Sequence, residues 1–126
     1  ATLDKYYLPY FAQVGTSLAT LDKLMSFTAE IYVPAHGHPS ADITEVLTAN
    51  KQRLQEVTKL VLSILTEPLS REEIVAWFYR EKGIDSSYSQ YFLSTAAITA
   101  HLTYLAEQGQ IKPKATDGVL KWYRSF

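Results

Sequence analysis

Apolar residues recur at intervals of three and four over most of the chain, which is the spacing of one face of an α-helix. The first such stripe predicts a helix over residues 10–25. A short β-prone run follows at residues 31–33, and Pro34 stops it. Residues 34–40 contain two prolines and one glycine, so we expect a tight loop in this place.

A second and longer stripe covers residues 43–65 and keeps helical spacing for about six turns. Ser40 or Asp42 can cap its beginning, because each side chain carries an oxygen that accepts a backbone N–H. We expect the helix to end at residues 66–68, since the residue before Pro68 is pushed out of the α region.

Two more helices are expected after this point. Ser70 and Glu73 have the spacing of a capping box, in which each side chain satisfies a free backbone N–H of the first turn. The box predicts a short helix that ends at Gly83. After a polar link at residues 85–87, periodic apolar residues predict a further helix over residues 91–105.

The C-terminal region has the pattern of a β-hairpin. Residues 111–115 and 119–124 predict two strands, and the Asp-Gly pair between them is a hairpin signal. Three helices can bury their apolar stripes only against one another, and the hairpin must cover the remaining edge. The pattern therefore predicts a mainly α fold, a winged helix of three helices plus a C-terminal β-hairpin, over residues 42–126.

Residues 1–41 are expected to form a separate unit. One helix and one short strand cannot satisfy the strand's backbone groups alone, so a pairing partner for residues 31–33 is expected outside this chain. The helix around residues 18–25 should then expose apolar surface or cover it in a homodimer. The first residue is Ala and not Met, which is typical of a processed or cut chain.

Composition narrows the class of protein. The chain has 126 residues, of which 47% are hydrophobic and 20% charged, a balance typical of a globular protein. The apolar runs are too short for a transmembrane span, so no membrane partner is expected. Cysteine is absent, which excludes disulfides and thiolate metal sites and leads us to expect a cytoplasmic protein.

Charge bears on the DNA-binding function that a winged helix suggests. The formal net charge is -1, and residues 83–111, which include the third helix, contain no Lys or Arg. A helix that reads the major groove normally brings several cations, so sequence-specific DNA binding is disfavoured. The hairpin is better placed for nucleic acid, although four cations on a solvated hairpin are ordinary: Lys112, Lys114, Lys121 and Arg124.

The residues offer several candidate groups but no complete active site. His36 and His38 lie two apart in the expected loop and could present both imidazoles to one ion, yet zinc needs three or four ligands. His101 lies in the middle of a predicted helix, where we interpret it as a surface or boundary histidine. The aromatic residues are a potential ligand platform, but at helical spacing they are more often core: Trp77, Phe78, Tyr79, Tyr88, Tyr91 and Phe92.

The stretch from Leu18 to His38 resembles the end of the catalytic domain in the metallo-β-lactamase superfamily. In that superfamily a helix leads into a short strand and then a Pro-Gly-His-Gly turn, whose histidine is the last zinc ligand. The turn here is Pro34-Ala35-His36-Gly37, with Ala where the family has Gly. The resemblance implies that residues 1–41 are the C-terminal part of an αββα domain and that His36 is a zinc ligand.

Residues 42–126 resemble the long helix and winged-helix domain that some of these hydrolases carry after the catalytic domain. The family's His-x-His-x-Asp-His cluster is absent from this chain, so the resemblance implies a missing N-terminal catalytic domain as its partner. The parent enzyme would use one or two zinc ions to activate water. The chain alone should be inactive and bind zinc only weakly, because His36 lacks the other ligands.

Three functions remain open at this point. The first is a C-terminal accessory region of a zinc-dependent hydrolase, in which the winged helix shapes the active site or substrate access. The second is a free-standing winged-helix transcriptional regulator that binds DNA as a dimer. The third is an interaction module that uses its aromatic surface. The superfamily's substrates include thioesters, lactams and phosphodiesters, and no residue of this chain separates them.

Overall fold

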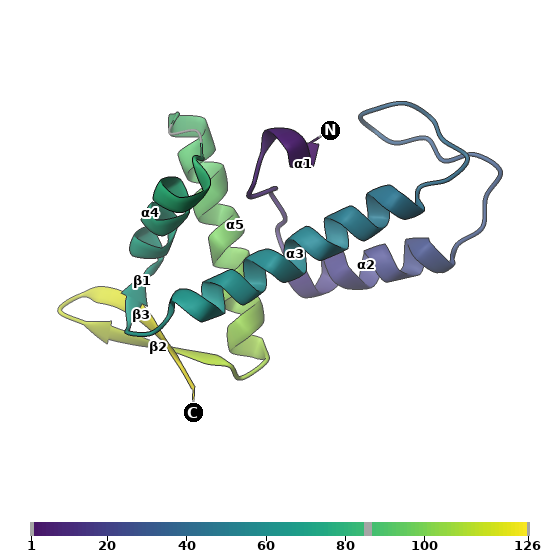
Figure 1. Ribbon diagram of the computed structural model, residues 1–126. Helices are drawn as coiled ribbons and strands as arrows, with labels where there is room; N and C mark the ends of the chain where they lie inside the picture. Colours follow the sequence, from purple (N-terminus) through teal and green to yellow (C-terminus); the bar gives the residue numbers. More distant parts are fainter. Residues whose placement is uncertain (1, 85–86, 126) are drawn as a thin grey trace.

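The computed structural model describes residues 2–84 and 87–125, and Figure 1 shows a long central helix with smaller elements packed at its two ends. Within these residues the elements, in chain order, are α1 (Thr2–Lys5), α2 (Val14–Ser26), α3 (Thr44–Ile64), β1 (Leu69–Ser70), α4 (Arg71–Lys82), α5 (Tyr88–Glu107), β2 (Ile111–Thr116) and β3 (Val119–Arg124). The fold is mainly helical with one small antiparallel sheet, as the pattern predicts.

The sheet has three strands in the order β1-β3-β2. Asp117 and Gly118 form the hairpin turn, and both have positive φ, at 52° and 77°, as a turn between two right-handed twisted strands requires. β2 extends one residue beyond its predicted end. β1 was not expected, because two residues carry no periodic signal; it forms where Leu69 pairs with Trp122.

Helix α3 begins slightly later than its predicted cap. Its N-cap position is Ile43, which offers no side-chain hydrogen bond. The predicted capping residue Asp42 acts one position earlier, where its carboxylate accepts the backbone N–H of Thr44 at 2.9 Å. That hydrogen bond lowers the pKa of the Asp42 carboxyl from its ordinary value. The helix ends at Ile64, in agreement with the stop expected before Pro68.

The capping box at the start of α4 is confirmed. The Ser70 hydroxyl accepts the N–H of Glu73 at 3.1 Å, and the Glu73 carboxylate accepts the N–H of Ser70 at 2.7 Å. The second hydrogen bond holds the pKa of Glu73 below its ordinary value. Gly83 ends the helix in the left-handed region, with a φ of 60°. Of the polar link expected next, residues 85 and 86 lie outside the described residues.

Helices α3, α4 and α5 share one apolar core, which Ile111 of β2 closes from the sheet side. The core includes Val57, Val61 and Leu65 from α3 and its end, Ile74, Val75 and Phe78 from α4, and Ile98, Leu102 and Leu105 from α5.

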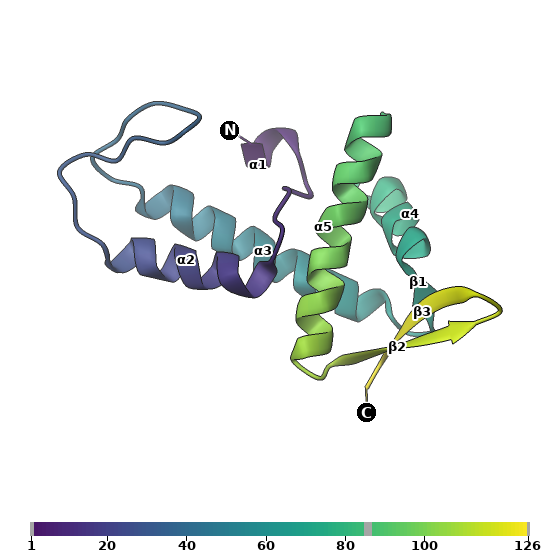
Figure 2. The same cartoon turned by 180° about the vertical axis from the view of Figure 1, so that it is seen from behind.

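Among the described residues, no helix combines the length and the apolar character needed to cross a bilayer. Figure 2 shows the same body from behind, with the sheet at the far end of α3 from the loop between α2 and α3.

The N-terminal segment is attached to this body by Arg53 of α3. The Arg53 guanidinium donates to the carbonyls of Tyr6 and Tyr7 at 3.2 and 3.0 Å and lies 4.6 Å from the centre of the Tyr7 ring. Burial raises the pKa of Tyr7 to about 12, with a further contribution from the charge of Glu56. Leu8 belongs to the core cluster, so residues before α2 contact the helical body. The domain division at residue 41 stays a prediction.

Two expectations for the first 41 residues need correction. The first long helix begins at Val14 and not at residue 10, because Leu8 is drawn into the core and the chain between them is not helical. The strand expected at residues 31–33 is only an isolated bridge, in which Tyr32 pairs with Ser40. Ile31 and Val33 are 60% and 73% exposed, since no further strand lies beside them in the described part of the chain.

The capping box makes a testable contribution to stability. We expect Ser70→Ala to lower the free energy of unfolding by about 1 kcal/mol, because a buried N-cap hydroxyl is lost. Chemical denaturation followed by circular dichroism measures this loss. Ser63→Ala is the matched control: its hydroxyl only donates to the Leu60 carbonyl within α3, and its effect should stay within about 0.5 kcal/mol. Equal losses in the two variants would contradict the assignment.

Candidate functional site

The loop that holds His36 and His38 connects the end of α2 to the start of α3. Its base is closed by two backbone hydrogen bonds between Tyr32 and Ser40, at 2.8 and 3.0 Å. The Tyr32 hydroxyl donates to the carbonyl of Phe27 at 2.8 Å and accepts the N–H of Ala29 at 3.2 Å. These contacts fix the two ends of the loop and leave its tip, with both histidines, exposed to solvent.

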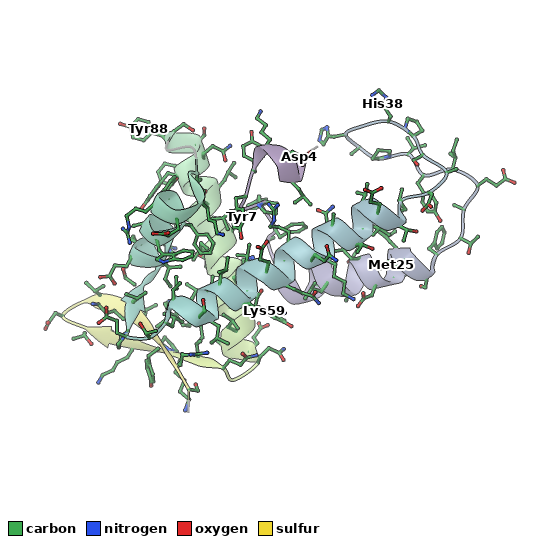
Figure 3. All side chains as sticks on the ribbon, in the orientation of Figure 1. Asp4, Tyr7, Met25, His38, Lys59 and Tyr88 are labelled. Atoms are coloured by element: carbon green, nitrogen blue, oxygen red, sulfur yellow. The ribbon has the colours of Figure 1, made fainter. Side chains whose placement is uncertain are left out.

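Gly37 sets the shape of the tip between the two histidines. Its φ of 114° lies in a region that side chains disfavour, and a Cβ added there would stand 3.6 Å from the Pro34 ring. The glycine of the sequence motif is therefore required by the backbone. Figure 3 shows His38, which is labelled, at the outer end of the loop and away from the helices.

The described residues do not assemble a metal site by themselves. No group of three or more His, Asp or Glu side chains that could hold an ion occurs in residues 2–84 and 87–125. Zinc takes three or four ligands, so His36 fits a zinc centre only as one ligand among others supplied from elsewhere. The prediction that His36 is such a ligand remains untested by this geometry.

The surface around the loop is apolar and uncovered. The C-terminal end of α2, the loop and the first turn of α3 expose large apolar side chains: Leu24, Met25, Phe27, Ile31, Val33 and Val46. Leu24 and Met25 at the end of the first helix are exposed in the single chain, and whether a homodimer covers them stays a prediction. A patch that mixes a helix end with a β-prone segment held only by the Tyr32–Ser40 bridge is typical of a surface that another part of a protein covers.

His101 was wrongly interpreted as a surface or boundary residue. It is only 3% exposed, on the face of α5 that packs against α3. Its Nδ1 is 2.8 Å from the hydroxyl of Thr58, which in turn donates to the carbonyl of Leu54. Burial lowers the pKa of His101 to about 4. The residue is a neutral, hydrogen-bonded part of the interface between α3 and α5, not a ligand.

The aromatic residues divide into two sets. Phe78 is fully buried and Trp77 packs edge-on against it at 5.0 Å between ring centres, so the expectation of core positions holds for α4. At the beginning of α5 it fails, because Tyr88 and Phe92 are 89% and 69% exposed. Tyr91 connects the sets: its ring stacks on Tyr79 at 6.1 Å and meets Phe92 edge-on at 5.9 Å.

The four hairpin cations lie as the strand pattern predicts. Lys112 and Lys114 are exposed on β2, whereas Lys121 and Arg124 of β3 are half-buried. Lys121 lies 3.9 Å from the carboxylate of Glu73.

The contacts of Arg53 with the N-terminal segment were not predicted from the sequence. Its carbonyl partners are 46 to 50 residues away, and no local pattern marks such a contact.

Solved structures with a similar fold are proteins of the metallo-β-lactamase family. A metallo-β-lactamase family protein from Thermus thermophilus is 22% identical, with a TM-score of 0.65 over 86% of this chain. A β-lactamase domain protein from Burkholderia ambifaria is 20% identical, with the same TM-score and coverage. Both comparisons cover only 32% of the other chain, so this chain spans about a third of their length. No family model and no curated protein matches the sequence.

The buried His101 predicts a defined dependence of stability on pH. Its pKa is about 4 in the folded chain and 6.5 in the unfolded one, so the unfolded chain binds the extra proton between these values. The stabilisation is fully present above about pH 6.5 and is lost as the pH falls toward 4. We expect a loss of about 2 kcal/mol between pH 7.5 and 5 from this residue.

Urea denaturation of the chain and of His101→Gln at both pH values measures this contribution. The glutamine can keep a hydrogen bond to Thr58 but does not titrate, so its stability should change about 2 kcal/mol less between the two pH values. A His101→Gln variant with the same pH dependence as the unchanged chain would show that other groups cause the acid loss.

Proposed function

We propose that this chain is the C-terminal part of a zinc-dependent metallo-β-lactamase-fold hydrolase and is inactive alone. In this proposal residues 1–41 complete the catalytic domain, and residues 42–126 form a winged-helix domain attached to it. The observation that carries the proposal is the coverage: two metallo-β-lactamase structures match 86% of this chain with only 32% of their own length. The remaining two thirds would supply the catalytic cluster that this chain lacks.

The uncovered apolar surface supports the same assignment. Ile31 and Val33 have β-prone side chains and unpaired backbone beside the His36 loop, as expected for the last strand of a sheet whose other strands are absent. Pairing with such a sheet would satisfy these backbone groups and bury both side chains. The partner that we propose for this surface is therefore the N-terminal catalytic domain of the same protein.

In the parent enzyme His36 would hold zinc through one imidazole nitrogen. Bound zinc lowers the pKa of a coordinated water and polarises the scissile bond. The contribution of this chain would be to shape the backbone that carries His36: the Tyr32–Ser40 hydrogen bonds close the loop, and Gly37 gives its tip a positive φ. His38 follows the glycine and has no assigned role in this scheme.

The helical body is joined to this loop through helices α2 and α3. Helix α2 enters the loop and α3 leaves it, the two helices pack against each other, and Lys51 of α3 pairs with Asp22 of α2 at 2.6 Å. Figure 3 places the labelled Tyr88 of α5 and the loop with His38 on the same side of α3, with Asp4 between them. We propose that the exposed aromatics of α5 face the substrate side of the active site and help to hold the substrate there.

The role of His36 can be tested in the full-length parent by metal analysis. We expect His36→Ala to lose at least one equivalent of bound zinc, and to lower kcat by 100-fold or more, on the order of 3 kcal/mol. His38→Ala is the matched control in the same loop and should keep both zinc and activity. Zinc content unchanged in His36→Ala, as measured by plasma mass spectrometry, would remove the basis of the proposal.

The role of the α5 aromatics requires a variant that leaves the fold intact. Truncation after Ser40 is unsuitable, because Leu8 would lose the core that it packs into. Phe92→Ala in the parent should instead raise KM roughly threefold to tenfold with zinc content unchanged, because uniform substrate binding is weakened. Leu120→Ala, also exposed but on the hairpin, should leave KM unchanged. Equal KM values for Phe92→Ala and the parent would exclude a role of Phe92 in holding the substrate.

A further inference from the structure

The hairpin and the segment that leaves α3 enclose a groove with an unusual set of side chains. The groove has a volume of about 630 Å³. Residues 65–68 form one wall, and Lys112, Lys114, Tyr123 and Arg124 form the other. The hairpin lies at the end of α3 opposite to the loop between α2 and α3 (Figures 1 and 2). The groove that it lines is therefore separate from the site described above.

The strand register places an aromatic ring among lysines on one face of the hairpin. Lys112 is directly opposite Tyr123, and Lys114 is directly opposite Lys121. Residues that face each other across an antiparallel pair share a side of the sheet, as do alternate residues of one strand. The side chains of Lys112, Lys114, Lys121 and Tyr123 therefore stand on the same face of the hairpin. Arg124 is opposite Ile111 and so belongs to the other face by this alternation, but it also lines the groove at the end of β3.

Within the described residues, the cations that line the groove form no internal ion pair. In the part of the chain that the structure describes, no carboxylate lies within 4.0 Å of Lys112, Lys114 or Arg124. Lys121 has only the 3.9 Å contact with Glu73. Residues 108–125 contain four Lys or Arg and one Asp, a local net charge of +3, whereas the whole chain has a formal net charge of -1.

We propose that this groove binds single-stranded nucleic acid without sequence preference, with phosphates on Lys112, Lys114 and Arg124 and a base stacked on Tyr123. Unpaired cations spaced along a strand match a phosphate backbone, and an aromatic ring in the same groove accepts any unstacked base. A duplex keeps its bases stacked inside and cannot use the tyrosine. The site is formed by the hairpin and residues 65–68 and does not rest on the hydrolase assignment.

Fluorescence anisotropy with the chain and labelled dodecamers of oligothymidine and oligouridine tests this site. Three phosphate contacts predict a slope of log affinity against log salt of about -2, which is roughly a 20-fold loss of affinity between 50 and 200 mM salt. Saturable binding of either strand supports the site, and the ratio of their affinities reports whether a 2′-hydroxyl is read. A duplex of the same length should bind more weakly than the single strands.

Two sets of variants identify the groove. Lys112→Gln with Lys114→Gln, both at exposed positions, should reduce the salt slope to about -0.7, or roughly a threefold loss over the same range. Lys23→Gln with Lys59→Gln removes the same charge from exposed positions on α2 and α3 and should leave the slope unchanged. Tyr123→Phe should bind as the unchanged chain does, whereas Tyr123→Leu should bind about tenfold more weakly or worse.

Several outcomes would overturn the proposal. These are no saturable binding of either strand, a duplex that binds as tightly as the single strands, or an unchanged slope in the Lys112→Gln, Lys114→Gln double variant. An equal loss in the Lys23→Gln, Lys59→Gln control would mean that net charge alone attracts the strand. A negative result in these binding experiments would not bear on the zinc prediction for His36, because that prediction is tested by the metal content of the parent.

Discussion

The continuity of helix α3 is the constraint on which the rest of the structure depends. Its buried stripe of Leu47, Leu54, Val57 and Val61 contacts different elements along its length. The first part packs against α2, and the later part packs against α5 and the core shared with α4 and β2. Because one helix serves both packing surfaces, the His36 loop at its beginning and the hairpin beyond its end keep a defined relation to each other.

Local sequence motifs predicted the elements of this fold well where the residues of the motif contact one another. The Ser70–Glu73 capping box and the Asp117–Gly118 turn are satisfied by residues within a few positions of each other, so the pattern contains all the partners. The strand expected at residues 31–33 failed for the opposite reason. A strand needs a neighbour to pair with, and the described residues supply only the single bridge to Ser40.

The candidate site was predictable only in part, for similar physical reasons. His36 could be singled out because its turn is a contiguous motif, but a coordination sphere joins residues from distant parts of a chain. Within the described residues no group of three or more potential ligands is assembled, so the role of His36 stays a prediction. The burial of His101 was missed because α5 has apolar or small residues on several faces, so its sequence does not show which face meets α3. The Arg53 contacts to the carbonyls of Tyr6 and Tyr7 lack any local signature.

The separation between the two proposed sites restricts what a single ligand could do. A helix rises 1.5 Å per residue, so the 21 residues of α3 hold the His36 loop and the hairpin groove about 30 Å apart. A compact thioester or lactam at the zinc centre could not reach Tyr123 as well. A polynucleotide could, because its phosphates continue along the strand while its end is held elsewhere.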